Sequence, residues 1–169
     1  ESQARGDLPA TLTTRSFCPP GEFDGAQATD HGTAVAEIVH EMAPGAQLFL
    51  VCSQTLTALG NAKNYAKQQQ VQIVNLSGTF INAVRGDGAG GPTTTDGIVA
   101  DARASGILWV NSAGNYAARH WSGTFADSDG DGIHNYAPDD EGNTVVVSQG
   151  EVFCAFLKWD SWPRTAQDY

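Results

Sequence analysis

Two side chains in this sequence have the type and the position for polar chemistry, each at the end of a predicted element. His31 lies in the first turn of a predicted helix, at the edge of a predicted sheet where α/β proteins place their ligands. Asn115 follows a buried strand that ends in Ala-Gly-Asn, and its side-chain amide can donate to a developing oxyanion. Each has a plainer alternative: the histidine caps or packs the helix, and the asparagine occupies a turn after glycine.

A third group of polar residues is acidic. In the segment 127–132 (DSDGDG), Asp127, Asp129 and Asp131 alternate with small residues, as in loops that bind calcium. An EF-hand would carry glutamate at its twelfth position, which is Pro138 here, so an EF-hand is not expected. A calcium loop of another type and a solvated acidic turn both remain. The other histidines, His40, His120 and His134, have no metal-ligand spacing.

The elements that would position these side chains alternate between helix and strand. Apolar side chains recur at helical spacing over residues 31–42, with Asp30 placed to cap this helix and Pro44 to break it. This order of elements predicts an α/β fold with a parallel sheet over residues 30–115. The predicted helices are residues 31–42, 57–69 and 94–104, and the predicted strands are residues 47–52, 71–76 and 106–111.

The flanking sequence differs in character. The residues before Asp30 are rich in glycine, proline and threonine, with one short predicted strand over 12–17. Residues 143–148 and 151–159 are rich in valine and phenylalanine, with Gly150 between them, which indicates a β-hairpin. The domain boundaries that we expect are 1–118 for a partial α/β core and 119–169 for a β-rich insertion or the start of one.

The composition narrows the range of partners. Apolar residues make up 41% and charged residues 17% of the 169 residues, which fits one folded domain. The formal net charge of −10 argues against nucleic acid or an anionic membrane as a partner. No apolar run approaches the roughly 20 residues of a membrane helix. The acidity fits a secreted or periplasmic, that is extracytoplasmic, protein, although many cytosolic proteins are equally acidic.

The three cysteines are too few for a disulfide scaffold. Because their number is odd, at least one of Cys18, Cys52 and Cys154 is expected to be free or to pair outside these residues. Cys52 ends an apolar run and is predicted to be a buried thiol. None has CxxC spacing, so zinc and redox chemistry have little support.

Three motifs, in this order and on these elements, resemble the subtilisin-like serine peptidases, or subtilases. They are residues 31–33 (HGT) opening a helix, residues 74–78 (VNLSG) ending a strand, and residues 112–115 (SAGN) ending the next strand. The resemblance implies that His31 is the general base and that Asn115 is the oxyanion donor. It also implies a peptide substrate that adds to a sheet edge by backbone hydrogen bonds. The residues expected to bind it are Ser77, Gly78, Ala113 and Gly114.

The fold that this resemblance implies is a doubly wound parallel sheet of the subtilisin type, with the β-rich insertion after Asn115. The family's catalytic aspartate follows an apolar strand, and neither Asp7 nor Asp24 does. The family's nucleophile opens a helix after the asparagine, and Ser122 lacks that context. We therefore expect a sheet truncated at both ends, and a chain that is inactive by itself and prone to self-association.

The activity expected of the parent protein is serine-type endopeptidase activity with no required cofactor and with calcium as a candidate ligand. A non-catalytic module that holds an extended peptide on the same sheet edge, or a subtilase-like relic without catalysis, remains an alternative. A nucleotide-binding α/β domain has little support, because residues 86–90 (GDGAG) do not form a GxGxxG motif between a strand and a helix.

Overall fold

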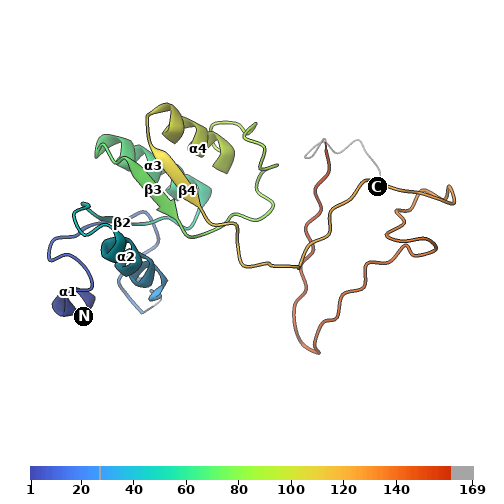
Figure 1. The fold of residues 1–169 in the computed structure, drawn as a ribbon, viewed down its shortest axis with the longest axis horizontal. Coiled ribbons are helices and arrows are strands. Elements are labelled where there is room, and N and C mark those ends of the chain that lie inside the picture. The colour runs from blue at the N-terminus through green and yellow to red at the C-terminus, as the bar shows by residue number, and fades with distance from the viewer. Residues whose placement is uncertain (27, 161–169) are drawn as a thin grey trace. The chain divides into compact units, whose positions relative to one another are not determined.

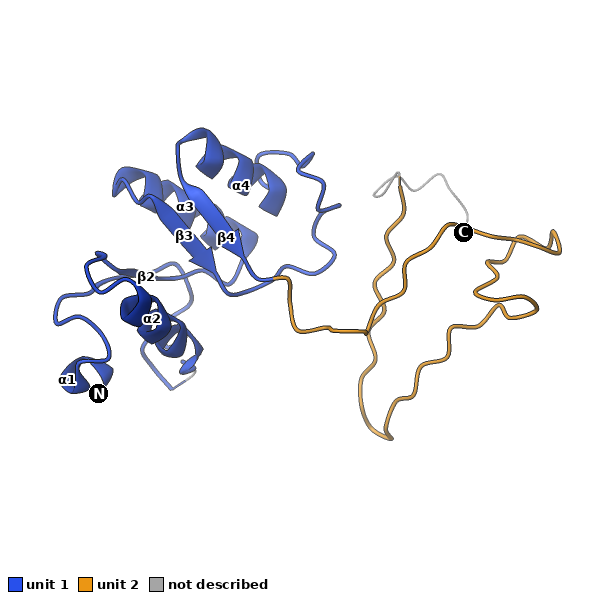
Figure 2. Ribbon diagram, in the orientation of Figure 1, with its two compact units in different colours: residues 1–112 blue, residues 113–169 orange. Residues whose placement is uncertain are grey.

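The computed structural model describes residues 1–26 and 28–160. The chain divides into two compact units, residues 1–112 and residues 113–169, which Figure 2 shows in separate colours. All the helices and strands of the described residues lie in the first unit (Figure 1).

Strands and helices alternate along most of the first unit, which makes it α/β. The elements are α1 (Ser2–Arg5), β1 (Thr13–Ser16), α2 (His31–Met42), β2 (Phe49–Cys52), α3 (Leu56–Gln68), β3 (Ile73–Leu76), α4 (Thr95–Ala104) and β4 (Leu108–Asn111). Each predicted helix and strand from residue 12 to residue 111 is confirmed, with bounds that shift by no more than two residues. The short helix α1 was not expected, because it covers a single turn without apolar periodicity.

The strands form two parallel pairs. β1 pairs with β2, so that Ser16 lies opposite Cys52, and β3 pairs with β4, so that Leu76 lies opposite Asn111. Each pair is joined by one crossover helix, α2 in the first case and α4 in the second. Among the described residues β2 and β3 are not hydrogen-bonded to each other, so the doubly wound sheet is not confirmed. The sequence pattern identified the strands and their parallel direction but not which strands would be neighbours.

The main hydrophobic cluster lies where α3 and α4 cover one face of the β3–β4 pair. Its buried members are Ala66 on α3, Ala102 on α4 and Ile107 before β4. Val74 and Trp109, which are neighbours across the two strands, pack against it. Alanine allows close approach of the helices to the strands, so the helix–sheet spacing depends on these small side chains.

Two of the helices begin with a side-chain cap. The hydroxyl oxygens of Thr55 and Thr94 accept hydrogen bonds from the N–H groups of Ala58 and Gly97, respectively. Both threonines have the extended backbone that this geometry requires. The predicted cap at Asp30 is wrong in part: Asp30 precedes α2, but its φ of −73° and ψ of −4° are helical and its side chain makes no cap hydrogen bond.

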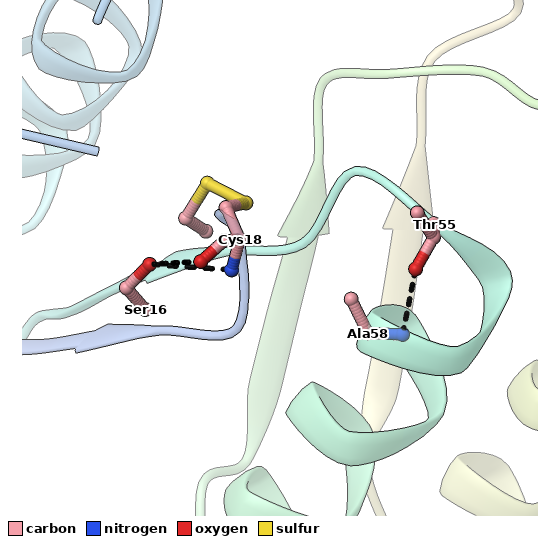
Figure 3. The surroundings of a disulfide bond; sticks show 5 residues. Ser16, Cys18, Thr55 and Ala58 are labelled. Carbon is pink, nitrogen blue, oxygen red and sulfur yellow. Dashed lines mark hydrogen bonds between the residues drawn. A yellow bond between two sulfur atoms is a disulfide. The ribbon is translucent and has the colours of Figure 1, made fainter. Parts of the chain in front are cut away.

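The predicted buried thiol at Cys52 is also wrong, because Cys52 forms a disulfide with Cys18 (Figure 3). The pairing of β1 with β2 brings these residues together: Ser16 lies opposite Cys52, and the N–H of Phe17 donates to the Cys52 carbonyl. The Ser16 hydroxyl oxygen accepts from the N–H of Cys18 at 3.2 Å. Cys154 is free and exposed, which confirms that one cysteine of the odd set is unpaired within the described residues.

The second unit has almost no regular structure in its described part, residues 113–160. Its one β-bridge joins Ala137 and Asp140. The β-hairpin predicted over residues 143–148 and 151–159 is absent, so the β-rich insertion is not confirmed. An isolated hairpin is marginal in water unless its apolar face packs on something. Val146 is 94% exposed, so its side chain has no such surface to pack on.

An aromatic cluster organises residues 121–136 of the second unit. The His134 ring lies 4.9 Å from that of Trp121 and 4.7 Å from that of Tyr136, measured between centroids. The N–H of Ala126 donates a hydrogen bond to Nδ1 of His134 at 3.0 Å. This histidine therefore packs the loop, as expected of a histidine outside any metal site. No helix among the described residues is long and apolar enough to cross a membrane.

Candidate functional site

The start of α2 and the end of β3 meet through one hydrogen bond. His31 is the first residue of α2, and its Nε2 lies 2.9 Å from the carbonyl oxygen of Ser77, which follows β3. A carbonyl oxygen can only accept, so in this arrangement the imidazole carries a proton on Nε2 and donates it. The structure thus brings together two of the predicted site residues from segments 46 positions apart.

A second set of polar contacts fixes the backbone that follows β3. The Ser112 hydroxyl donates to the Gly78 carbonyl at 3.1 Å. The Asn111 side-chain amide donates to the Ser112 carbonyl at 2.7 Å and also reaches the Gly78 carbonyl at 3.4 Å. On the other side, the Asn75 amide donates to the Ser77 hydroxyl at 2.9 Å. The segment of Ser77 and Gly78 is therefore held by side chains from both strands.

Sequence reasoning did not assign a role to Asn75, Asn111 or Ser112. A signal was present, because all three are polar residues in or just after predicted parallel strands. The carboxyl ends of neighbouring parallel strands lie at one edge of a sheet, where ligands bind in α/β proteins. The register of β3 on β4 places Leu76 opposite Asn111 and so brings the two polar segments side by side.

Gly32 follows His31 in the first turn of α2. In the described residues, a Cβ atom built at Gly32 would meet nothing within 4 Å. The space beside this turn is therefore open. His31 itself is exposed, so its imidazole is accessible from solvent.

The predicted residues Ala113, Gly114 and Asn115 open the second unit. Gly114 has a φ of +85°, and a Cβ atom there would lie 3.0 Å from the ring of Tyr116, so this position favours glycine. Asn115 is exposed and does not have a positive φ, so it does not adopt the left-handed turn conformation that was its plainer alternative. Its role as an oxyanion donor stays a prediction.

The three aspartates of the acidic loop converge. One carboxylate oxygen from each of Asp127, Asp129 and Asp131 lies within 4.8 Å of the others. Hydrogen bonds shape the loop: the N–H of Gly130 and the N–H of Gly132 donate to the Asp127 carboxylate at 2.7 and 3.0 Å. These donations, the one from Gly132 above all, lower the pKa of Asp127 below its ordinary value.

Glu141 adds a fourth carboxylate to the surroundings of this loop. The negative charge of Asp131, and then those of Asp129 and Asp127, raise the pKa of Glu141 above its ordinary value. Several carboxylates that repel one another in this way form a donor set that fits a hard cation such as Ca²⁺, which takes six to eight oxygen ligands. Asp127, Asp129 and Asp131 are the residues that could hold such an ion.

Comparison with known families agrees with the three motifs. A family model described as the subtilase family, Peptidase S8, matches residues 20–151, which include His31, Ser77 and Asn115. The chain therefore belongs to the subtilase family. Comparisons with curated proteins and with solved structures found no significant match.

Proposed function

We propose that this chain is the part of a subtilisin-like serine endopeptidase that supplies the general base and the oxyanion donor. The family match over residues 20–151 supports this, and the single observation that carries it is the contact between His31 and the Ser77 carbonyl. That contact joins the predicted base to the strand end on which a peptide would lie. The aspartate and the serine of the triad would come from outside these residues.

The proposed chemistry is acyl transfer. A serine hydroxyl attacks the peptide carbonyl carbon while its proton passes to Nε2 of His31, and the same proton later passes to the leaving amine. The side-chain amide of Asn115 donates to the oxyanion that forms on the carbonyl oxygen. Because Nε2 of His31 now donates to the Ser77 carbonyl, that hydrogen bond must break before the ring can accept a proton there.

The proposed substrate is an extended peptide segment. A strand that adds to a sheet edge binds by main-chain hydrogen bonds, whatever its side chains. The segment of Ser77 and Gly78 leaves β3 without a second strand on the side of His31 among the described residues. Ala113 and Gly114 would line the pocket for the side chain that precedes the cleaved bond.

The contact between His31 and Ser77 also favours one alternative, a peptide-binding module without catalysis. In that case the imidazole is a hydrogen-bond donor to the backbone and never a base. The alternative keeps the peptide on the same edge and needs neither the aspartate nor the serine.

Two measurements on the 169-residue chain test these proposals. Titration with acetylated, amidated peptides should shift the amide NMR signals of Ser77 and Gly78, and unchanged signals would contradict peptide binding at this edge. A fluorophosphonate probe should label no serine, and peptide amides should not be cleaved. Stoichiometric labelling of any serine, Ser122 included, would show that the chain holds its own nucleophile.

We propose further that the protein is secreted and that Asp127, Asp129 and Asp131 bind calcium. The disulfide between Cys18 and Cys52 supports the first point, because disulfides form and persist in oxidising compartments. The convergence of the three carboxylates supports the second. Calcium would stabilise the loop by binding the folded form, and the proposed peptide chemistry has no step that requires it.

A further inference from the structure

The backbone beyond β3 alternates its carbonyl groups in the way a strand does. The Leu76 carbonyl accepts from the N–H of Ser112 at 3.1 Å, toward β4. The Ser77 carbonyl accepts from His31, and the Gly78 carbonyl accepts from the Ser112 hydroxyl. Successive carbonyl groups of an extended chain point to opposite sides, so the first and third face β4 while the second faces the other way.

Ser112 therefore makes two hydrogen bonds to one extended segment. Its N–H contributes the last backbone bond of the β3–β4 ladder, and its hydroxyl contributes one more bond beyond the point where the strands end. The amide of Asn111 holds the Ser112 carbonyl at 2.7 Å and so fixes the backbone that carries this hydroxyl. Alanine at position 112 would keep the ladder bond and lose the bond to Gly78.

From this geometry we propose that Ser112 is a positioning residue for peptide binding. By holding the Gly78 carbonyl toward β4, the Ser112 hydroxyl fixes the peptide plane between Gly78 and Thr79, which anchors the extended segment that includes Ser77. The Ser77 carbonyl is thereby aimed at the opposite edge, where an N–H of an extended peptide can replace the imidazole as its donor. Ser112 in this way sets the register at which the peptide pairs, and the inference rests on the proposed function of this edge.

Replacement of the donor couples peptide binding to His31. When a peptide N–H binds the Ser77 carbonyl, Nε2 of His31 loses its acceptor and is free for another partner. A substrate that uses this register therefore releases the ring that would act on it. A substrate bound in another register would leave the imidazole on the carbonyl.

The test uses a matched pair of variants that differ only in the hydroxyl, Ser112→Thr and Ser112→Val, together with Ser112→Ala. The probe is an acetylated and amidated tetra-alanine peptide, with analogues that are N-methylated at one amide at a time. Ser105→Ala is the control, because the Ser105 hydroxyl likewise donates to a backbone carbonyl, that of Asp101, away from the edge. Binding constants and the carbonyl ¹³C shifts of Ser77 and Gly78 are measured by NMR on the whole chain.

We expect Ser112→Ala and Ser112→Val to weaken peptide binding about fivefold, the loss of one net hydrogen bond, and to shift the Gly78 carbonyl signal. Ser112→Thr and Ser105→Ala should bind as the wild type does. One N-methylated analogue should bind weakly to the wild type and lose nothing further in Ser112→Val, because the two changes remove the same pairing.

Three outcomes would overturn the inference and are distinguishable. If the wild type binds the peptide and the valine and threonine variants bind it equally well, Ser112 does not position the edge, and the proposed peptide binding stands. If no peptide perturbs Ser77 or Gly78 in the wild type, the proposed function of this edge fails and the inference fails with it. An unchanged Gly78 carbonyl signal in Ser112→Val would overturn the inference without reference to any peptide.

Discussion

The imidazole of His31 donates to the carbonyl of Ser77, and this hydrogen bond would oppose the role of general base that we propose for His31. A histidine that donates from Nε2 cannot accept a proton at the same atom. An aspartate that bound Nδ1 would favour the tautomer with its proton there and leave Nε2 as an acceptor, which is the role of the acidic member of a triad. Under the proposed function, such an aspartate would therefore weaken the contact between His31 and Ser77.

The acidic loop gives the first prediction at the scale of single residues. Millimolar Ca²⁺ should raise the melting temperature of the chain, because an ion that binds only the folded form stabilises it by mass action. The Asp129→Ala variant should lose this rise, since one of the three converging carboxylates is removed. Asp127 is the poorer choice for a variant, because its carboxylate also holds the N–H groups of Gly130 and Gly132.

Melting curves with Ca²⁺ and with EDTA measure this effect. Asp24→Ala serves as the control, since it removes one negative charge outside the loop. An equal melting temperature with and without the ion in the wild type would show that the loop is a solvated acidic turn.

At the scale of elements, the helix starts differ in a way that unfolding experiments can resolve. Thr55→Ala and Thr94→Ala should each lower the free energy of unfolding by about 1 kcal/mol, because each removes a side-chain cap. Asp30→Ala should cost clearly less, since the Asp30 side chain caps nothing. Urea titrations followed by circular dichroism measure the three values. A loss at Asp30 as large as that at Thr55 would contradict the assignment of the caps.

A cluster of charges joins α3 to α4 and makes their packing depend on pH. Lys63 and Lys67 both donate to the Asp101 carboxylate, the latter at 2.9 Å. These hydrogen bonds, the one from Lys63 first, lower the pKa of Asp101. A carboxyl whose pKa is lower in the folded state adds stability above its unfolded pKa of about 4, and this stability is lost as the pH falls through the folded pKa.

Asp101→Asn should therefore lower the melting temperature at pH 7, and the difference from the wild type should vanish in strong acid. There the wild-type carboxyl is protonated as well, so both chains lack the charge. Melting temperatures from neutral to acidic pH, with Asp24→Asn as the control, measure this convergence. A difference that stays constant down to the lowest pH would show that the variant acts through packing alone.

The sequence predicted these elements better than it predicted their neighbours. Helix α2 was predicted to the residue, because Val35, Ile38 and Val39 mark its apolar face and Pro44 breaks the pattern. Periodicity is a local property, so it reveals that β3 is a strand but not which strands hydrogen-bond to it. The disulfide was missed for the same reason. Cys18 and Cys52 are 34 positions apart in the sequence, and only the register of β1 on β2 brings them together.

The candidate site was likewise predicted only in part. The order of the motifs led to His31 and Ser77, which lie together in the structure. Asn111 and Ser112 were missed, because their role depends on which strand end lies beside them. A hydroxyl that donates to a carbonyl 34 positions away leaves no mark in the local sequence pattern.

At the scale of the whole molecule, α3 and α4 cover one face of the β3–β4 pair, and the side chains of the other face are exposed. Val74 and Trp109 pack under α3 and α4, whereas Ile73, Leu108 and Val110 are on the opposite face and are 61%, 59% and 46% exposed. Ile73 and Leu108 are neighbours across the two strands, so they form a continuous apolar surface. A surface of this kind favours association with a second copy.

We therefore predict that the isolated chain self-associates at micromolar concentration. Burial of a few hundred square ångströms of apolar surface contributes several kcal/mol, at about 25 cal/mol per Å². Leu108→Thr should weaken the association, whereas Leu157→Thr, which changes an equally exposed leucine of the second unit, should not. Sedimentation equilibrium measures the change. A wild-type chain that sediments as a monomer and melts in one sharp transition would contradict the prediction.

The disulfide between Cys18 and Cys52 would hold the chain together after proteolytic damage. The loop that it closes contains the turn-rich segment after Cys18 and the whole of α2 with His31. A peptidase that nicked the exposed part of this loop would leave both pieces joined through sulfur. The nicked protein would migrate as one chain in a gel without reductant and separate into two bands once a thiol was added. The piece that carries His31 would stay attached to the piece that carries β1 after the backbone between them had been cut.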